Sequence, residues 1–278
     1  MNAEALPYTL YIILIELAVG CLWMTLHTDL QGHGVTRGFV MTMSFCTTVA
    51  AGLAYMTGKS VDVGIDVDGY PIDASWFQPT QRALVAFIVT GAIYSFSVFM
   101  GWDPIGRLSG LAGAVAGLIA VGTLAAFLTP PAWGFAGVFI ALAAGTLAMG
   151  AVSTAMVWGH WYLAEGSLPQ RPMRELSWTC IGVVAVQLIV LVINVAIPEQ
   201  ITPMPSNPID VNVLMNPAFF FRVAVGLVFT AVLSVLALKT AKIGAMQSTT
   251  GLFYVAMSAV FTGEVLARGI QFLTAKPV

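Results

Sequence analysis

Charged residues are scarce in this sequence, and their scarcity restricts the class of protein. Lysine, arginine, aspartate and glutamate together make up 9% of the 278 residues, whereas hydrophobic residues make up 58%. A soluble domain carries about a quarter charged residues, so this chain cannot form a water-compatible surface. We therefore expect a membrane protein. Lysine and arginine form no cluster, so we expect no nucleic-acid partner.

Motifs of several enzyme and channel classes are also missing. The patterns H-E-x-x-H and G-x-S-x-G and a phosphate-binding glycine loop do not occur, nor does an arginine-rich voltage-sensing helix. The three cysteines form no C-x-x-C pair, and we interpret Cys21, Cys46 and Cys180 as small apolar residues of three helices. No basic segment precedes the first apolar run, which we therefore expect to be a membrane-spanning helix rather than a secretory signal.

Long apolar stretches dominate the sequence. A hydrocarbon core about 30 Å thick requires roughly 20 apolar residues per helix. We predict an all-α polytopic membrane protein, a bundle of about eight transmembrane helices that forms a single domain over residues 1–278, with no internal repeat between its halves. The predicted spans are Tyr8–His27, Phe39–Thr57, Leu84–Trp102, Leu108–Leu128, Trp133–Trp158, Thr179–Ile197, Ala218–Leu238 and Gly251–Leu273.

The connections between the spans predict the orientation. Two of them are longer, residues 58–83 and the proline-rich residues 198–217, and an even number of spans puts both on the same side as the two termini. Most lysines and arginines fall in the other loops, which we place in the cytoplasm of a bacterial inner membrane. Both termini and both longer loops then lie outside. Residues 61–70 alternate apolar and polar side chains around Asp68-Gly69, which predicts a β-hairpin in the first external loop.

Ionisable residues inside the predicted spans are the first functional candidates, because burying a charge in a bilayer is costly. Glu16, Gln187, Glu264 and Arg268 fall in this group. Glu16 and Glu264 lie at similar depths, and Arg268 is placed to pair with Glu264 one turn away. A carboxylate beside an arginine suits proton uptake and release, so we predict proton transfer by Glu16, Glu264 and Arg268. The alternative is a structural ion pair between helices.

Histidines and aromatic residues are candidates for a cofactor site. Glu16, Gly20, Trp23 and His27 share one face of the first predicted helix and would line a proton path or a ligand cleft. His160 lies among interfacial aromatic residues at the end of the fifth span. His27 and His160 are candidate axial ligands of a haem b iron, or, with Trp23, contacts for a quinone headgroup. Interfacial histidines bonded to a backbone carbonyl or a lipid are the alternative.

Small residues recur along the fourth predicted helix. Gly106, Gly110, Gly113 and Gly117 are three or four positions apart and so form a stripe on one side of this helix. Such a stripe lets neighbouring helices approach closely. We interpret it as a packing surface and assign it no functional role.

The end of the last predicted helix has a familiar pattern. Its segment Thr262-Gly263-Glu264-Val265-Leu266-Ala267-Arg268 resembles the Gly-Glu-x-x-x-Arg closing segment of membrane anchor subunits of the dimethyl-sulfoxide-reductase type. Those anchors also have eight helices, a similar length and an external N-terminus. The resemblance is confined to this motif and the architecture, and the quinone-site histidine and glutamate of that family have no clear counterpart here. It implies a subunit that anchors a molybdenum and iron–sulfur enzyme and exchanges electrons with quinones, often without haem.

These observations favour one function and leave two others open. The leading hypothesis is a membrane subunit of a respiratory electron-transfer complex. This subunit would anchor a redox partner, such as an iron–sulfur protein or a multihaem cytochrome, and would bind quinone in an apolar cleft with nearby acid–base groups. The alternatives are a proton-coupled transporter, with Glu16 and Glu264 as coupling carboxylates, and an accessory or assembly subunit without a ligand.

Overall fold

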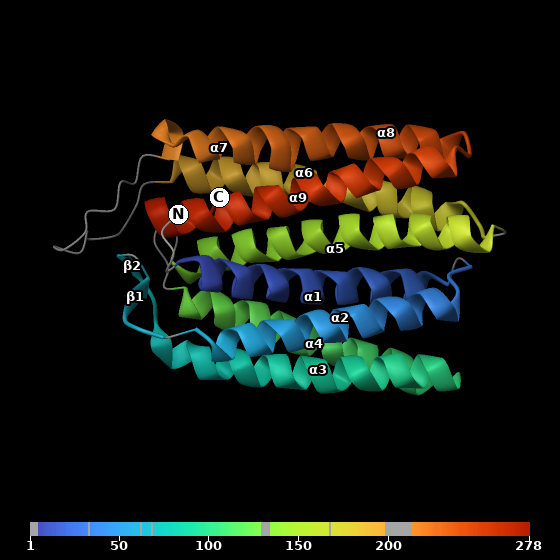
Figure 1. Ribbon diagram of the computed structural model, residues 1–278, viewed down its shortest axis with the longest axis horizontal. Coiled ribbons are helices and arrows are strands. Elements are labelled where there is room, and N and C mark those ends of the chain that lie inside the picture. Colours follow the sequence, from blue (N-terminus) through green and yellow to red (C-terminus); the bar gives the residue numbers. More distant parts are fainter. Residues whose placement is uncertain are drawn as a thin grey trace.

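The protein is a long bundle of helices (Figure 1). A computed structural model describes residues 5–32, 34–61, 63–67, 69–128, 134–166, 168–197 and 213–278. Within these residues eight helices are long and apolar enough to cross a membrane, which confirms the predicted all-α, eight-span architecture. The spans are α1 (Ala5–Gln31), α2 (Arg37–Lys59), α3 (Phe77–Met100), α4 (Asp103–Phe127), α5 (Phe135–Glu165), α6 (Arg171–Ala196), a composite span (Pro217–Lys242) and α9 (Met246–Thr274).

The composite span changes its helical geometry along its length. It begins as the short helix α7 (Pro217–Phe221), continues as the π-helical segment η3 (Arg222–Phe229) and ends as α8 (Thr230–Lys242). The start is conventional, because the side chain of Asn216 caps the backbone N–H of Ala218 and a proline occupies the first turn. π-Helical turns are rare and occur frequently at functional sites.

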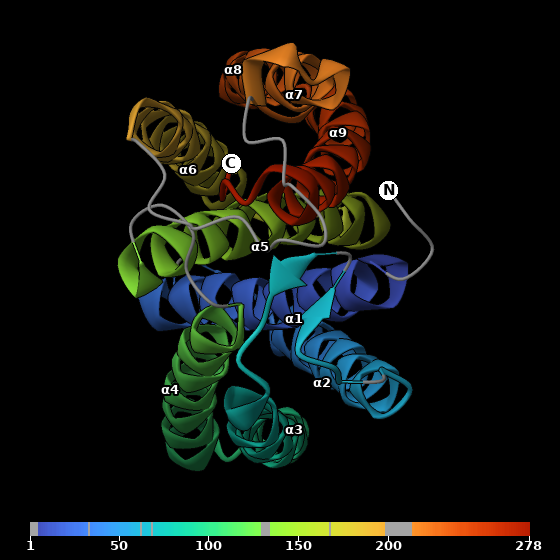
Figure 2. The same cartoon turned by 90° about the vertical axis from the view of Figure 1, so that its left-hand side faces the viewer.

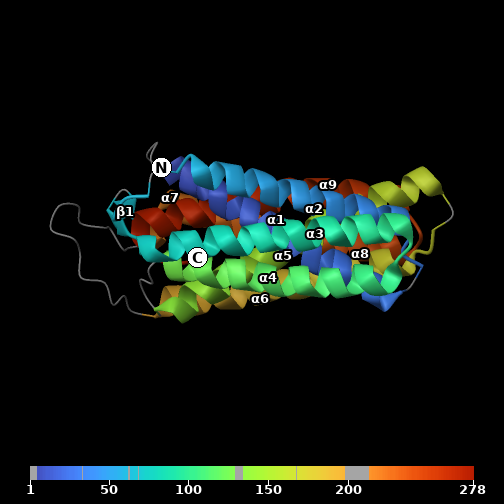
Figure 3. The same cartoon turned by 90° about the horizontal axis from the view of Figure 1, so that it is seen from below.

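The eight spans form two units of four helices (Figure 2). In the N-terminal unit, α1 contacts α2 and α4, and α3 lies between α2 and α4. In the C-terminal unit, α5 contacts α6 and α9, and the composite span lies between α6 and α9. The two halves therefore repeat one arrangement of neighbours, and α1 and α5, the first helices of the two units, meet between them. Figure 3 shows the same bundle from the side of α3 and α4.

The prediction of no internal repeat concerns the sequence, and it stays a prediction, because four consecutive up-and-down helices contact one another in this order in any such unit. Matching residues occur at equivalent positions: Glu16-Leu-Ala-Val-Gly20 in α1 corresponds to Thr146-Leu-Ala-Met-Gly150 in α5. Helices α1 and α5 cross at these two glycines, where the backbone of each would collide with a Cβ atom on the other.

The glycine stripe of α4 packs as predicted. A Cβ atom on Gly110 would meet Leu26 of α1 and Tyr94 of α3, and one on Gly117 would meet Val19 and Phe87 of the same two helices. The glycines therefore let α4 pack closely against α1 and α3 at once.

A short β-hairpin covers one end of the bundle. Strand β1 (Asp66–Val67) pairs antiparallel with β2 (Tyr70–Pro71), as the sequence predicted, and a 3₁₀ turn, η1 (Ala74–Trp76), leads into α3. Both ends of the described chain lie at this end of the bundle (Figure 1). The second predicted external loop, residues 198–217, lies largely outside the described residues. Its described part begins with the 3₁₀ turn η2 (Val213–Met215).

The lateral surface of the bundle is apolar, as contact with lipid requires. Large hydrophobic side chains such as Phe45, Phe99 and Val192 are more than half exposed there. All three cysteines are free, and Cys21 and Cys180 are buried while Cys46 is exposed on α2. The polar residues that remain inside the bundle are therefore the exceptions.

Candidate functional site

Four charged side chains meet inside the bundle and form what we call the charge cluster: Glu16, Arg222, Glu264 and Arg268. Their side chains are at most 3% exposed. Glu16 comes from α1 of the N-terminal unit, whereas the other three come from η3 and α9 of the C-terminal unit. The cluster therefore lies across the boundary between the two units.

Arg268 connects the two units. Its Nη2 atom lies 3.1 Å from Glu16 Oε1 and 3.2 Å from Glu264 Oε2. The second pair is the one-turn pairing expected from the sequence. The structure also brings Glu16 and Glu264 to the same level, as the predicted depths required.

Glu264 has further partners that make it the best-neutralised group in the cluster. Arg222 Nη2 lies 3.1 Å from its Oε1 atom, and Gln187 Nε2 of α6 donates a hydrogen bond of 2.6 Å to the same oxygen. Gln187 was a sequence candidate. Arg222 was not, although it is an arginine within the apolar stretch Ala218–Leu238, and that signal could have identified it.

Three glycines make room for these side chains. A Cβ atom on Gly145 of α5 would lie 2.6 Å from Glu264 Oε2 and 2.8 Å from Glu16 Oε1, so both carboxylates converge on this point of α5. A Cβ atom on Gly226 would lie 2.6 Å from the Cα atom of Gly263, and Arg222 Nη1 lies beside both glycines. Gly263 precedes Glu264 in the motif identified from the sequence, and its role is close contact between α9 and η3.

A chain of hydrogen bonds runs from the cluster to the hairpin end. Arg268 Nη1 donates to Gln271 Oε1 at 2.9 Å, and Gln271 Nε2 donates to the Tyr70 hydroxyl at 3.4 Å. The Tyr70 hydroxyl donates in turn to the carbonyl of Leu128 at 3.0 Å. Burial raises the pKa of Tyr70 well above its usual range, so the hydroxyl keeps its proton. These bonds fix the orientation of the Arg268 guanidinium.

The two carboxylates are not equivalent. Glu264 accepts hydrogen bonds from Gln187 and Arg268, whereas neither oxygen of Glu16 accepts one from the described residues beyond its ion pair with Arg268. The cluster is neutral when all four groups are ionised. Protonation of Glu16 breaks one ion pair and no hydrogen bond, so Glu16 is the group that can take a proton at the smallest cost.

The charge cluster lies far from both ends of α1 and well inside α9. At 1.5 Å per residue, Glu16 is roughly 16 Å from the start of α1, and Glu264 is about 15 Å from the end of α9. A hydrocarbon core is about 30 Å thick, so neither headgroup region is within reach of these side chains. A proton that reaches Glu16 must travel into the bundle.

The other predicted site residues do not join the cluster. Trp23 Nε1 donates to the carbonyl of Ala114 in α4 at 3.1 Å, while Gly20 faces α5, so the stripe on α1 serves several neighbours rather than one path. His27 is exposed and hydrogen-bonds to Gln31 of its own helix.

His160 is also exposed, and it hydrogen-bonds to Tyr254 of α9 at 3.3 Å. The rings of His27 and His160 therefore hydrogen-bond to different helices, and neither is in the bundle interior, where a haem between them would be held. Haem b stays a prediction. Among the described residues, no group of three or more His, Cys, Asp or Glu side chains is placed to hold a metal ion.

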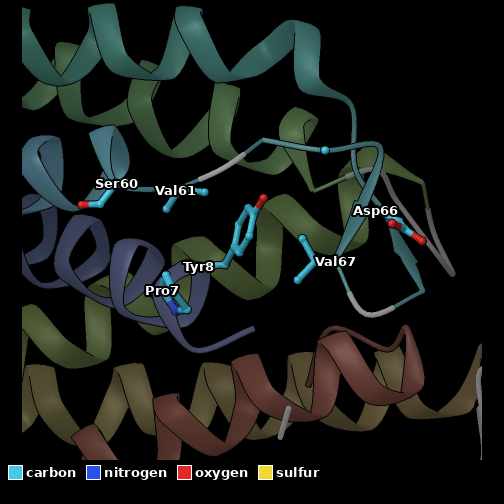
Figure 4. Close-up of a pocket in the computed structure, with 7 residues that line it drawn as sticks. Pro7, Tyr8, Ser60, Val61, Asp66 and Val67 are labelled. Atoms are coloured by element: carbon cyan, nitrogen blue, oxygen red, sulfur yellow. The ribbon is translucent and has the colours of Figure 1, made fainter. Parts of the chain in front are cut away.

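A pocket of about 410 Å³ opens beneath the hairpin (Figure 4). Tyr8 of α1 lies in it between Val61 and Val67, and its ring stacks on Phe127. The pocket therefore marks the surface at which the hairpin, α1 and the segment that follows α2 meet. It is separate from the charge cluster, which lies deeper along α1.

Comparisons of the chain with protein-family models, with curated proteins and with solved structures find no significant match. Any proposal for the function of this chain therefore rests on its own sequence and structure.

Proposed function

We propose that this chain is the membrane subunit of an electron-transfer complex in a bacterial cytoplasmic membrane, and that it exchanges electrons and protons with the quinone pool. The observation that carries the proposal is Glu16, a carboxylate fully buried in the bundle whose one ion-pair partner among the described residues is Arg268. Reduction of a quinone consumes protons together with electrons, so a site in the apolar core of a membrane needs an internal acid–base group.

The charge cluster is suited to this task. Arg268 contacts both Glu16 and Glu264, so when Glu16 takes a proton the guanidinium remains paired with Glu264. Arg222 and Gln187 keep Glu264 ionised in either state. Only the proton on Glu16 changes, and the other three groups provide a fixed electrostatic setting for that change.

The proposal also assigns each end of the bundle to one side of the membrane. Arg37, Arg107 and Lys242 lie at the end opposite the hairpin, which we place in the cytoplasm. The hairpin end then faces outward and offers the surface on which a redox partner, an iron–sulfur protein or a multihaem cytochrome, docks. No step of the proposal passes through haem, and a reduced-minus-oxidised spectrum of the purified protein tests whether a b-type haem is present.

The test of the proposal is Glu16→Gln in the native complex, reconstituted in lipid vesicles with a quinone analogue. General acid–base groups contribute about 100-fold to 10,000-fold, so we expect quinone-linked proton uptake to fall by about 100-fold. The matched control is Glu165→Gln, an exposed carboxylate at the end of α5, which should keep the original rate. Unchanged proton uptake in Glu16→Gln would contradict the role of Glu16 in proton transfer, on which the proposal rests.

A second candidate function is a proton-coupled transporter, and the position of the charge cluster between the two four-helix units favours it. Many transporters bind their substrates at the interface between two halves of the bundle, which is where the charge cluster lies. The π-helical segment at Arg222 would supply the irregular helix. Purification in mild detergent separates the two candidates, because an electron-transfer subunit should co-purify with redox partners and a transporter should not.

A further inference from the structure

A cavity of about 140 Å³ lies between α1, α2, α5 and α9, away from the hydrogen bonds of the charge cluster. It opens sideways toward the lipid, because Cys46 is exposed and Ala50 and Met257 are half-buried. The side chains that matter for its chemistry are Leu17, Cys21, Met43, Cys46, Ser153 and Met257.

The size of the cavity fits one six-membered ring. An engineered protein cavity of about 150 Å³ binds benzene, and the present cavity has nearly the same volume. A long chain attached to such a ring would leave through the lipid-facing opening between α2 and α9. The cavity therefore suits a molecule with a flat ring and an apolar tail that arrives from the bilayer.

The lining of the cavity also favours an aromatic or quinonoid ring. Met43, Met156 and Met257 enter it from three different helices, and thioether sulfurs make favourable contacts with flat π-systems. The remaining walls are apolar apart from two hydroxyls. A charged or strongly polar ligand would lose its hydration here without compensation.

One of the two hydroxyls is available to bind a ligand. Thr47 donates to the backbone carbonyl of Ser44 at 2.8 Å, as buried helical hydroxyls commonly do. Ser153 is 4% exposed, and the Cys21 thiol, a weak hydrogen-bonding group, is the one partner of its hydroxyl among the described residues. A buried donor of this kind can bind one carbonyl oxygen.

Residues that line the cavity lie close in sequence to residues of the charge cluster, on the same two helices. Leu17 and Ala18, which line it, directly follow Glu16 on α1. On α9, Met257 lies two turns before Glu264. At 1.5 Å per residue, Met257 lies about 10 Å from Glu264 along α9, and Cys21 lies about 7.5 Å from Glu16 along α1.

We propose that this cavity holds the headgroup ring of a quinone, with Ser153 donating a hydrogen bond to one quinone carbonyl. This inference rests on the proposed function and assigns the substrate of that function to a specific place. The ring enters between α2 and α9, its tail stays in the lipid, and Glu16 is the nearest buried carboxylate on α1.

The inference is tested with an azido derivative of decyl-ubiquinone, photolysed on the complex in its membrane and mapped by mass spectrometry of the labelled peptides. We expect label in the segments around Cys46 of α2 and Ser153 of α5, and competition by excess decyl-ubiquinone. Ala50→Phe should fill the cavity and lower this labelling at least tenfold. The matched control is Leu53→Phe, one turn away on α2 and 54% exposed to lipid, which should leave labelling unchanged.

A second variant tests the proposal even if Ala50→Phe does not fold. Ser153→Ala removes only the hydroxyl and should weaken decyl-ubiquinone binding about fivefold to tenfold, whereas Ser153→Thr should keep most of the affinity. Competed label elsewhere, for example in the surface groove between α2 and α3 that Phe45 and Phe99 line, would overturn this site but leave the quinone function in place. Absence of any competed label would count against the quinone function itself.

Discussion

Arg268 is the residue on which the charge cluster depends, because a single nitrogen of its guanidinium contacts carboxylates from both four-helix units. Its orientation is fixed by Gln271, which is held in turn by Tyr70 of the hairpin. A lysine at this position has one point charge and no planar fork, so it could not contact both carboxylates and Gln271 in the same way. The cluster therefore requires arginine here.

Arg222 offers the clearest test at the level of single residues. Removal of one member of a buried ion pair leaves an uncompensated charge and costs about 3–5 kcal/mol. We expect Arg222→Leu to destabilise the protein by this amount, measured as the shift of its unfolding transition in detergent.

The double variant Arg222→Leu with Glu264→Gln is the control for this prediction. It leaves Arg268 paired with Glu16, so the buried charges balance again, and its stability should exceed that of Arg222→Leu alone. The 3.1 Å separation of Arg222 Nη2 and Glu264 Oε1 indicates that the two side chains interact. If the changes in unfolding free energy of the two substitutions were additive, this interaction would be contradicted.

Contacts between helices depend on backbone approaches that only glycine permits. At the crossing of α1 and α5, a Cβ atom on Gly150 would collide with the backbone of Gly20. We expect Gly150→Ala to force the two units apart and to lower stability by at least about 1–3 kcal/mol, seen as a lower melting temperature in detergent.

Gly182 of α6 supplies the matched control for this element. A Cβ atom added there meets nothing within 4 Å, so Gly182→Ala should keep or slightly raise the melting temperature. Equal melting temperatures for both variants would contradict the close crossing of α1 and α5.

The same close contacts explain how much of the structure could be predicted from the sequence. Hydropathy identified every span, and the position of Glu264 and Arg268 one turn apart predicted their pairing. The partnership of Glu16 with Arg268 could not be predicted, because it depends on which helices are neighbours. Arg222 was not predicted as a site residue. It lies near the start of its span, where the long side chain of an arginine often reaches the membrane surface.

The orientation of the bundle decides which side of the membrane a redox partner docks on, because the proposed docking surface is at the hairpin end. The distribution of lysine and arginine predicts that this end is external. Single cysteines test this prediction when the three native cysteines are replaced by alanine. Ser75→Cys lies at the hairpin end and Ser248→Cys at the opposite end, and both native side chains are exposed. A membrane-impermeant maleimide applied to intact cells should label Ser75→Cys, whereas it should label Ser248→Cys only after the membrane is opened. The reverse pattern would turn the bundle over and place the docking surface in the cytoplasm, while the charge cluster, being buried inside the bundle, would keep its proposed role in either orientation.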